Sequence, residues 1–97
     1  MKLSVTPNMI MTKIYTYCLF DGNEAFCGVY SSLKAVHRDA LKIANAGPHC
    51  VQMETDGHIE APSLTSLRNV FKGRCDVMVL YRNGAYYSKI IKTKLQE

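Results

Sequence analysis

The stretch Arg74–Leu95, RCDVMVLYRNGAYYSKIIKTKL, decides how this chain folds. Two runs rich in β-branched and aromatic residues flank the dipeptide Asn83-Gly84, which favours a two-residue type I′ turn. The stretch therefore predicts a β-hairpin whose register places Tyr81 opposite Tyr86.

Side chains alternate between the two faces of a strand, so this hairpin has two distinct faces. Val77, Val79 and Ile90 fall on one of them, which we expect to face the core. The other face mixes apolar and basic side chains, which is typical of an interaction surface. We therefore expect a partner-binding site formed by Arg74, Met78, Leu80, Arg82, Tyr87, Lys89 and Ile91.

The first part of the chain predicts a second hairpin followed by a helix. Residues 13–20 and 25–30 have the composition of strands, and the turn DGNE joins them at residues 21–24. The segment SSLKAVHRDALKIANAGP, residues 31–48, then begins with a capping serine and ends at Gly-Pro. Apolar residues recur on one side of this helix, at Leu33, Val36, Ala40, Ile43 and Ala44.

The middle of the chain completes the element order. HCVQMET and HIEA read as short strands joined by Asp56-Gly57, and a shorter helix follows from Pro62 to Gly73. The resulting order ββαβ(β)αββ predicts an α+β two-layer sandwich, with five or six mainly antiparallel strands and two helices on one face. We expect one domain over residues 11–97, preceded by a flexible extension at residues 1–10.

Charge is unevenly distributed along the 97 residues, which carry a formal net charge of +4. From Arg68 onward there are seven Lys/Arg against two acidic residues, a pattern that favours an anionic partner. Tyrosine and lysine side chains on a sheet can stack on bases and contact phosphates. An alternative nucleic-acid site would therefore use Tyr86, Tyr87, Lys89, Lys92 and Lys94.

The sequence offers little for catalysis or metal binding. The four cysteines, at positions 18, 27, 50 and 75, form no C-x-x-C pair, and we expect them to be reduced and buried. His49 and Cys50 are adjacent, so they point to opposite faces of a strand. His58 lies in an acidic turn that we interpret as polar surface. We expect no catalytic residues, no metal and no cofactor, and the chain has no apolar run long enough to span a membrane.

The segment VYSSLKAVHRDALKIAN, residues 29–45, leads from a strand into a serine-capped, alanine-rich helix. In this segment and in its architecture the chain resembles small accessory proteins of tailed bacteriophages. The resemblance implies a non-enzymatic, host-modulating protein that docks on a host protein or defence complex in the host cytoplasm. It carries over no site residues. Single-stranded nucleic-acid binding remains the alternative function, and an open sheet edge or the apolar hairpin face could instead be covered by a second copy in a homodimer.

Overall fold

The structure is a computed structural model that describes residues 15–44, 51–74 and 77–94. The expected extension at residues 1–10 lies outside these ranges. Six strands and two helices follow one another along the chain in the order that the sequence predicts. They are β1 (Tyr15–Asp21), β2 (Phe26–Tyr30), α2 (Leu33–Ala44), β3 (Gln52–Thr55), β4 (His58–Glu60), α3 (Leu64–Phe71), β5 (Met78–Asn83) and β6 (Tyr86–Lys94).

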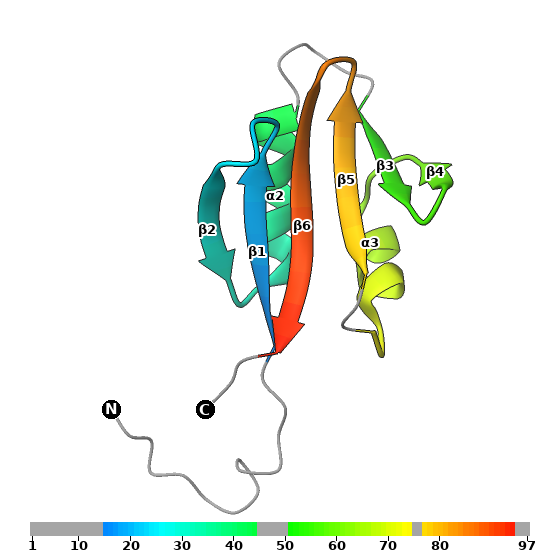
Figure 1. Ribbon diagram of the computed structural model, residues 1–97. Coiled ribbons are helices and arrows are strands. Elements are labelled where there is room, and N and C mark those ends of the chain that lie inside the picture. Colours follow the sequence, from blue (N-terminus) through cyan, green and yellow to red (C-terminus); the bar gives the residue numbers. More distant parts are fainter. Residues whose placement is uncertain (1–14, 45–50, 75–76, 95–97) are drawn as a thin grey trace, which may run out of the picture.

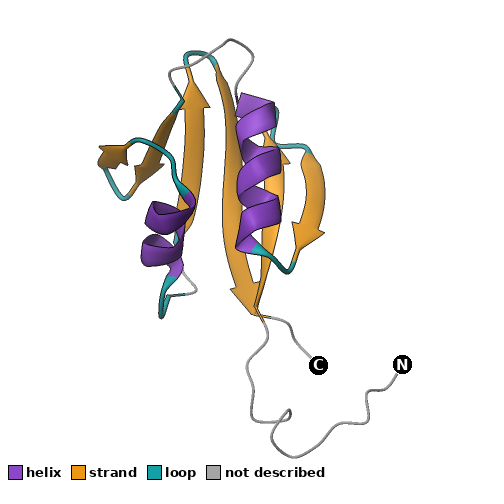
Figure 2. Ribbon diagram, turned by 180° about the vertical axis from the view of Figure 1, so that it is seen from behind, coloured by secondary structure: helices purple, strands orange, loops and turns teal. Residues whose placement is uncertain are grey.

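All six strands belong to one antiparallel sheet with the order β2-β1-β6-β5-β3-β4. Both helices lie on the same side of this sheet, behind it in Figure 1 and in front of it in the reverse view of Figure 2. The predicted two-layer α+β sandwich is thereby confirmed. Within the described ranges, helices cover one face of the sheet and no helix covers the opposite face.

The C-terminal hairpin forms as predicted, but its turn is displaced by one residue. Asn83 pairs with Tyr86, so that Gly84 and Ala85 form the turn, and Tyr81 lies opposite Ser88. The predicted pairing of Tyr81 with Tyr86 is therefore wrong. Gly84 has φ of +63° at the first turn position, where a type II′ turn requires glycine. Every partner shifts by two residues, an even number, so each side chain keeps its predicted face.

Local capping explains where the helices begin and end. The backbone N–H of Ala35 donates to Ser32 Oγ at 3.2 Å, and that of Ser66 donates to Ser63 Oγ at 3.0 Å. Each bond satisfies an N–H group that has no partner within its helix. After α3, Gly73 adopts φ of +70°, the left-handed conformation typical of a residue that follows a helix.

The core lies between the helices and the covered face of the sheet. Its fully buried members come from both layers and include Leu19, Val36, Ala40, Ala44, Met53, Leu67, Phe71, Val77, Val79, Tyr81 and Ile90. Two polar contacts tie α2 to the sheet inside this core. The Ser88 hydroxyl donates to the Ala40 carbonyl at 2.9 Å, and Tyr81 Oη lies 2.6 Å from His37 Nδ1. These bonds fix α2 along β5 and β6.

The cysteines differ from the expectation of buried thiols. Cys27 is exposed and Cys18 is half-buried, and both are free. Cys27 is exposed because the pairing of β1 with β2 shifts between Leu19 and Phe20, where the register passes from Gly28 directly to Phe26. The expectation is therefore wrong for Cys27. Cys50 and Cys75 lie outside the described residues.

Candidate functional site

The candidate site is the sheet face opposite α2 and α3, which no helix of the described part of the chain covers and which faces the reader in Figure 1. We call this surface the open face. The pairing register and the alternation of side chains assign fifteen residues to it, most of them apolar or uncharged, and the exposed Gln52, which pairs with Arg82, is one of them. The other fourteen are Thr16, Cys18, Phe20, Phe26, Val29, Glu54, Ile59, Met78, Leu80, Arg82, Tyr87, Lys89, Ile91 and Thr93.

An apolar row crosses four neighbouring strands of the open face. Cys18 pairs with Val29 on one side and Ile91 on the other, and Ile91 pairs with Met78. Directly paired side chains of adjacent strands contact one another, so the row is continuous. Val29 is 58% exposed and Met78 is 46% exposed, so both ends of the row are accessible to a partner.

A second row crosses all six strands and mixes apolar with charged side chains. In spatial order it runs through Phe26, Phe20, Lys89, Leu80, Glu54 and Ile59. The rings of Phe20 and Phe26 meet edge to face with centroids 5.7 Å apart, and Lys89 Nζ lies 5.2 Å from the Phe20 centroid. Phe26 and Ile59, at the two ends, are 59% and 55% exposed.

Both cations of the open face have carboxylate partners within the chain. Arg82 Nε donates to Glu54 Oε2 at 3.0 Å, and Lys89 Nζ donates to Glu24 Oε1. The Tyr87 hydroxyl also donates to Glu24, at 2.5 Å. These hydrogen bonds, from Lys89 first and Tyr87 second, lower the pKa of Glu24, and the bond to Glu24 raises the pKa of Tyr87. The two cations and two carboxylates make this part of the surface neutral.

The turn between β1 and β2 brings Glu24 to the open face. Asp21 Oδ1 accepts hydrogen bonds from the backbone N–H groups of Asn23 and Ala25, at 2.8 and 3.0 Å. Within this turn Glu24 has positive φ, at +64°. This conformation lets a residue of the first hairpin reach side chains on β6, more than sixty positions later in the chain.

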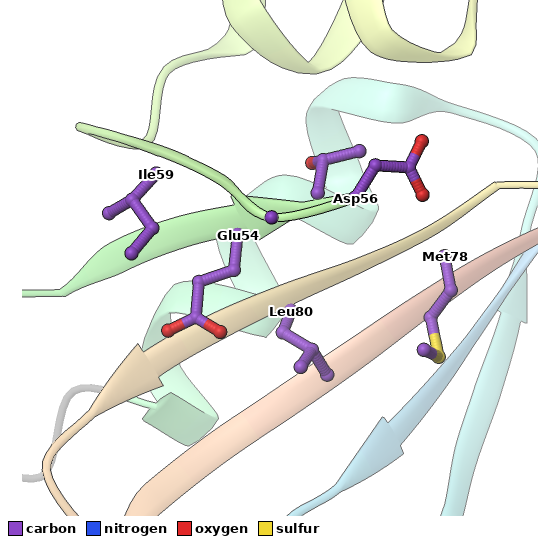
Figure 3. A pocket seen from close by; sticks show the side chains of 7 residues that line it. Glu54, Asp56, Ile59, Met78 and Leu80 are labelled. Atoms are coloured by element: carbon purple, nitrogen blue, oxygen red, sulfur yellow. The ribbon is translucent and has the colours of Figure 1, made fainter.

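A shallow hollow of about 420 Å³ lies at the β3–β5 side of the open face. Figure 3 shows Glu54, Leu80 and Met78 pointing to the same side of the sheet beside it. Asp56 and Ile59 complete its rim. Glu54 is engaged by Arg82, and Asp56 accepts from Arg74 at 3.3 Å. The hollow therefore offers apolar contacts bordered by paired charges.

The structure brings together most of the predicted partner-binding residues. Met78, Leu80, Arg82, Tyr87, Lys89 and Ile91 all lie on the open face. Arg74 precedes β5, outside the sheet, and borders this surface through its ion pair with Asp56.

The residues of the nucleic-acid alternative do not share one surface. Tyr87 and Lys89 lie on the open face, but Tyr86 and Lys92 alternate with them and belong to the covered side. Lys92 is only 6% exposed, and its Nζ donates to the Phe71 carbonyl at 2.7 Å. Its ammonium group caps the end of α3, so this lysine does not lie on a surface with Tyr87 and Lys89. The side chain of Lys94 lies outside what the structure describes.

The two described histidines each lie near another side chain of the chain. Burial lowers the pKa of His37, which contacts the buried Tyr81 hydroxyl. His58 is exposed and lies 3.6 Å from Glu60. Among the described residues, no three His, Cys, Asp or Glu side chains are grouped as metal ligands. Over the same ranges, neither helix has the length and hydropathy needed to cross a bilayer. His49, Cys50 and Cys75 lie outside them.

Sequence reasoning missed the part of the open face that the first hairpin contributes. Cys18, Phe20, Phe26 and Val29 join the surface because β1 pairs with β6. Alternation within residues 13–20 could have placed Cys18 and Phe20 on one side of their strand. No local pattern shows that this strand neighbours the C-terminal one.

Comparison with known proteins gives no further identification. No family model matches the chain, and neither a curated protein nor a solved structure is significantly similar to it.

Proposed function

We propose that this protein is a non-catalytic binding module that docks through its open face on another protein. The observation that carries the proposal is the continuous apolar row from Val29 to Met78, beside a mixed row that ends in Phe26 and Ile59. All four of these large apolar side chains are exposed. Scattered apolar residues are normal on a protein surface, but contiguous ones mark interaction sites.

The size of the open face suits a protein partner. Six strands about 4.8 Å apart, each contributing about six residues, give a surface of roughly 25 by 20 Å, or about 500 Å² in projection. A standard interface buries about 800 Å² of accessible surface per partner, and accessible area exceeds projected area on a surface with relief. The open face is therefore large enough to form most of one side of such an interface.

The charge pattern indicates the chemistry of the partner. Arg82 and Lys89 are paired with Glu54 and Glu24, so the open face has no excess charge to attract a polyanion. A protein surface that is itself apolar at its centre and bears hydrogen-bonding groups at its border would leave both ion pairs intact. The resemblance of residues 29–45 to phage accessory proteins supports the narrower proposal that the partner is a host protein or defence complex in the cytoplasm.

Site-specific photo-crosslinking tests this proposal. A photoreactive amino acid replaces Met78 on the open face or, as the matched control, the exposed Lys34 on α2. Both proteins are irradiated in lysate of the source cells. We expect a discrete protein adduct from position 78 that excess unmodified protein competes away, and none from position 34.

Light scattering with a single-stranded oligonucleotide, at low and moderate salt, completes the test. We expect no complex at either salt concentration. Equal crosslinking from both positions would contradict docking through the open face. A complex that weakens steeply with salt would instead favour the nucleic-acid alternative.

A further inference from the structure

The two edges of the sheet differ in how they are protected against pairing with another strand. Exposed edges are templates for association, and proteins guard them with short strands, charged residues and proline. At one edge, β4 has only three residues, two of them His58 and Glu60, and Pro62 follows closely. This edge is guarded by all three devices.

The other edge, β2, is less protected: it is longer than β4, and only the register shift at Cys27 interrupts it. Its five residues, FCGVY, include no charge and no proline. Among the described residues, β1 is the only strand paired with β2, so the outer backbone groups of β2 have no strand beside them. The shifted register at Cys27 leaves Gly28 to Tyr30 as the regular part of the strand.

We propose that β2 pairs in antiparallel orientation with β2 of a second copy of this chain. A second copy fits this edge because identical strands related by a two-fold axis present identical side chains to each other. The chain as a whole carries a formal net charge of +4, but β2 has no charged residue. Pairing of β2 with its own copy therefore places no like charges opposite one another. A strand bearing lysine or glutamate would meet its own charge across the axis.

The geometry of this pairing joins the two open faces. A two-fold axis perpendicular to the sheet keeps both helical layers on one side and both open faces on the other. The two Val29 side chains, each now 58% exposed, would lie opposite each other at the axis, and Phe26 lies three residues away from it. Directly opposed side chains in antiparallel strands have Cβ atoms about 5 Å apart, close enough to bury part of these apolar groups. The regular pairing is short, so we expect a dissociation constant in the range of about 1 to 100 µM.

The test measures the mass of the full chain in solution by sedimentation and light scattering, from about 1 to about 500 µM, a range that spans the expected constant. Three variants place a lysine at exposed apolar positions: Val29→Lys on β2, Ile59→Lys on the opposite edge and Met78→Lys in the centre of the open face. Circular dichroism confirms that each variant folds. We expect the wild type, I59K and M78K to approach twice the 10.9-kDa chain mass, and V29K to stay at the chain mass.

Hydrogen exchange of the wild type provides a second measurement that needs no variant. We expect the amides of residues 28–30 to become more protected as concentration rises, while those of β4 do not change. A wild type that stays at the chain mass, or a V29K protein that dimerises as the wild type does, overturns the pairing. Dissociation by M78K as complete as that by V29K also overturns it, because it would show packing of open face on open face. Photo-crosslinking at position 78 to a different protein is independent of all these results, so the pairing and the proposed function can fail separately.

Discussion

The contact between Tyr81 and His37 links α2 to the centre of the sheet, and Tyr81→Phe removes it with little other change. Tyr81 is fully buried and its hydroxyl lies 2.6 Å from His37 Nδ1. The phenyl ring keeps the apolar packing, so no large cavity forms. Loss of a neutral hydrogen bond costs about 1 kcal/mol, and a partly buried nitrogen left without its partner adds to this. We expect the free energy of unfolding to fall by about 1 to 2 kcal/mol.

Urea unfolding at neutral pH measures this change, with His37→Leu and the double variant completing a cycle. We expect the double variant to be less destabilised than the sum of the two single variants, because both remove the same contact. A Y81F protein as stable as the wild type, or strictly additive effects, would refute the view that this bond stabilises the core.

The burial of His37 gives the stability a defined dependence on pH. Burial lowers the pKa of His37 below its ordinary value of 6.5, so the unfolded chain binds a proton more readily than the folded one. Stability is therefore complete above that value and decreases as the pH falls from 6.5 towards the folded-state pKa. Urea midpoints at several pH values measure the slope. We expect H37L to flatten it, and an unchanged slope would assign it to other groups.

Three further predictions concern single sites. Gly57→Ala lowers the free energy of unfolding, measured with urea, by about 1 kcal/mol. Gly57 has φ of +82° and no atom lies within 4 Å of an added Cβ, so the cost comes from backbone strain alone. An unchanged urea midpoint would contradict this. Ser63→Ala removes the N-cap of α3 and costs about 1 kcal/mol in the same assay, and Ser63→Asp, which keeps a capping oxygen, serves as the control. Lys89→Gln raises the pKa of Glu24 towards its ordinary value in a carboxyl NMR titration, and an unmoved pKa would show that the two groups are not paired in solution.

The sequence predicts the helices, the strands and the faces of the strands well, because all of these follow from patterns that repeat every two to four residues. Alternation over two residues assigns the faces of β5 and β6 correctly even though the turn lies at Gly84-Ala85 and not at Asn83-Gly84. Serine caps and the spacing of apolar residues locate both helices for the same local reason. A shift by one residue would have exchanged core and surface, but a shift by two leaves them unchanged.

The neighbours of each strand could not be predicted, because strand order depends on contacts between distant parts of the chain. The sequence gives no local sign that β1 lies beside β6, and this pairing alone extends the apolar row from Met78 and Ile91 to Cys18 and Val29. The role of Lys92 was hidden in the same way. The alternation of side chains along β6 places Lys92 on the covered face. Its hydrogen bond to the Phe71 carbonyl, however, depends on where α3 packs, which no local pattern shows.

These long-range contacts also change the meaning of the charge asymmetry. Seven cations from Arg68 onward suggest an anion-binding surface when they are counted along the chain. In the described part of the fold, Arg74, Arg82 and Lys89 form ion pairs with acidic residues of the first two-thirds of the sequence, at Asp56, Glu54 and Glu24. Lys92 binds the end of a helix. The acidic first part of the chain thus neutralises much of the basic last part across the sheet. The open face is therefore an apolar surface whose charges are balanced. We expect it to select a protein partner by shape and hydrogen bonding and not by net electrostatic attraction.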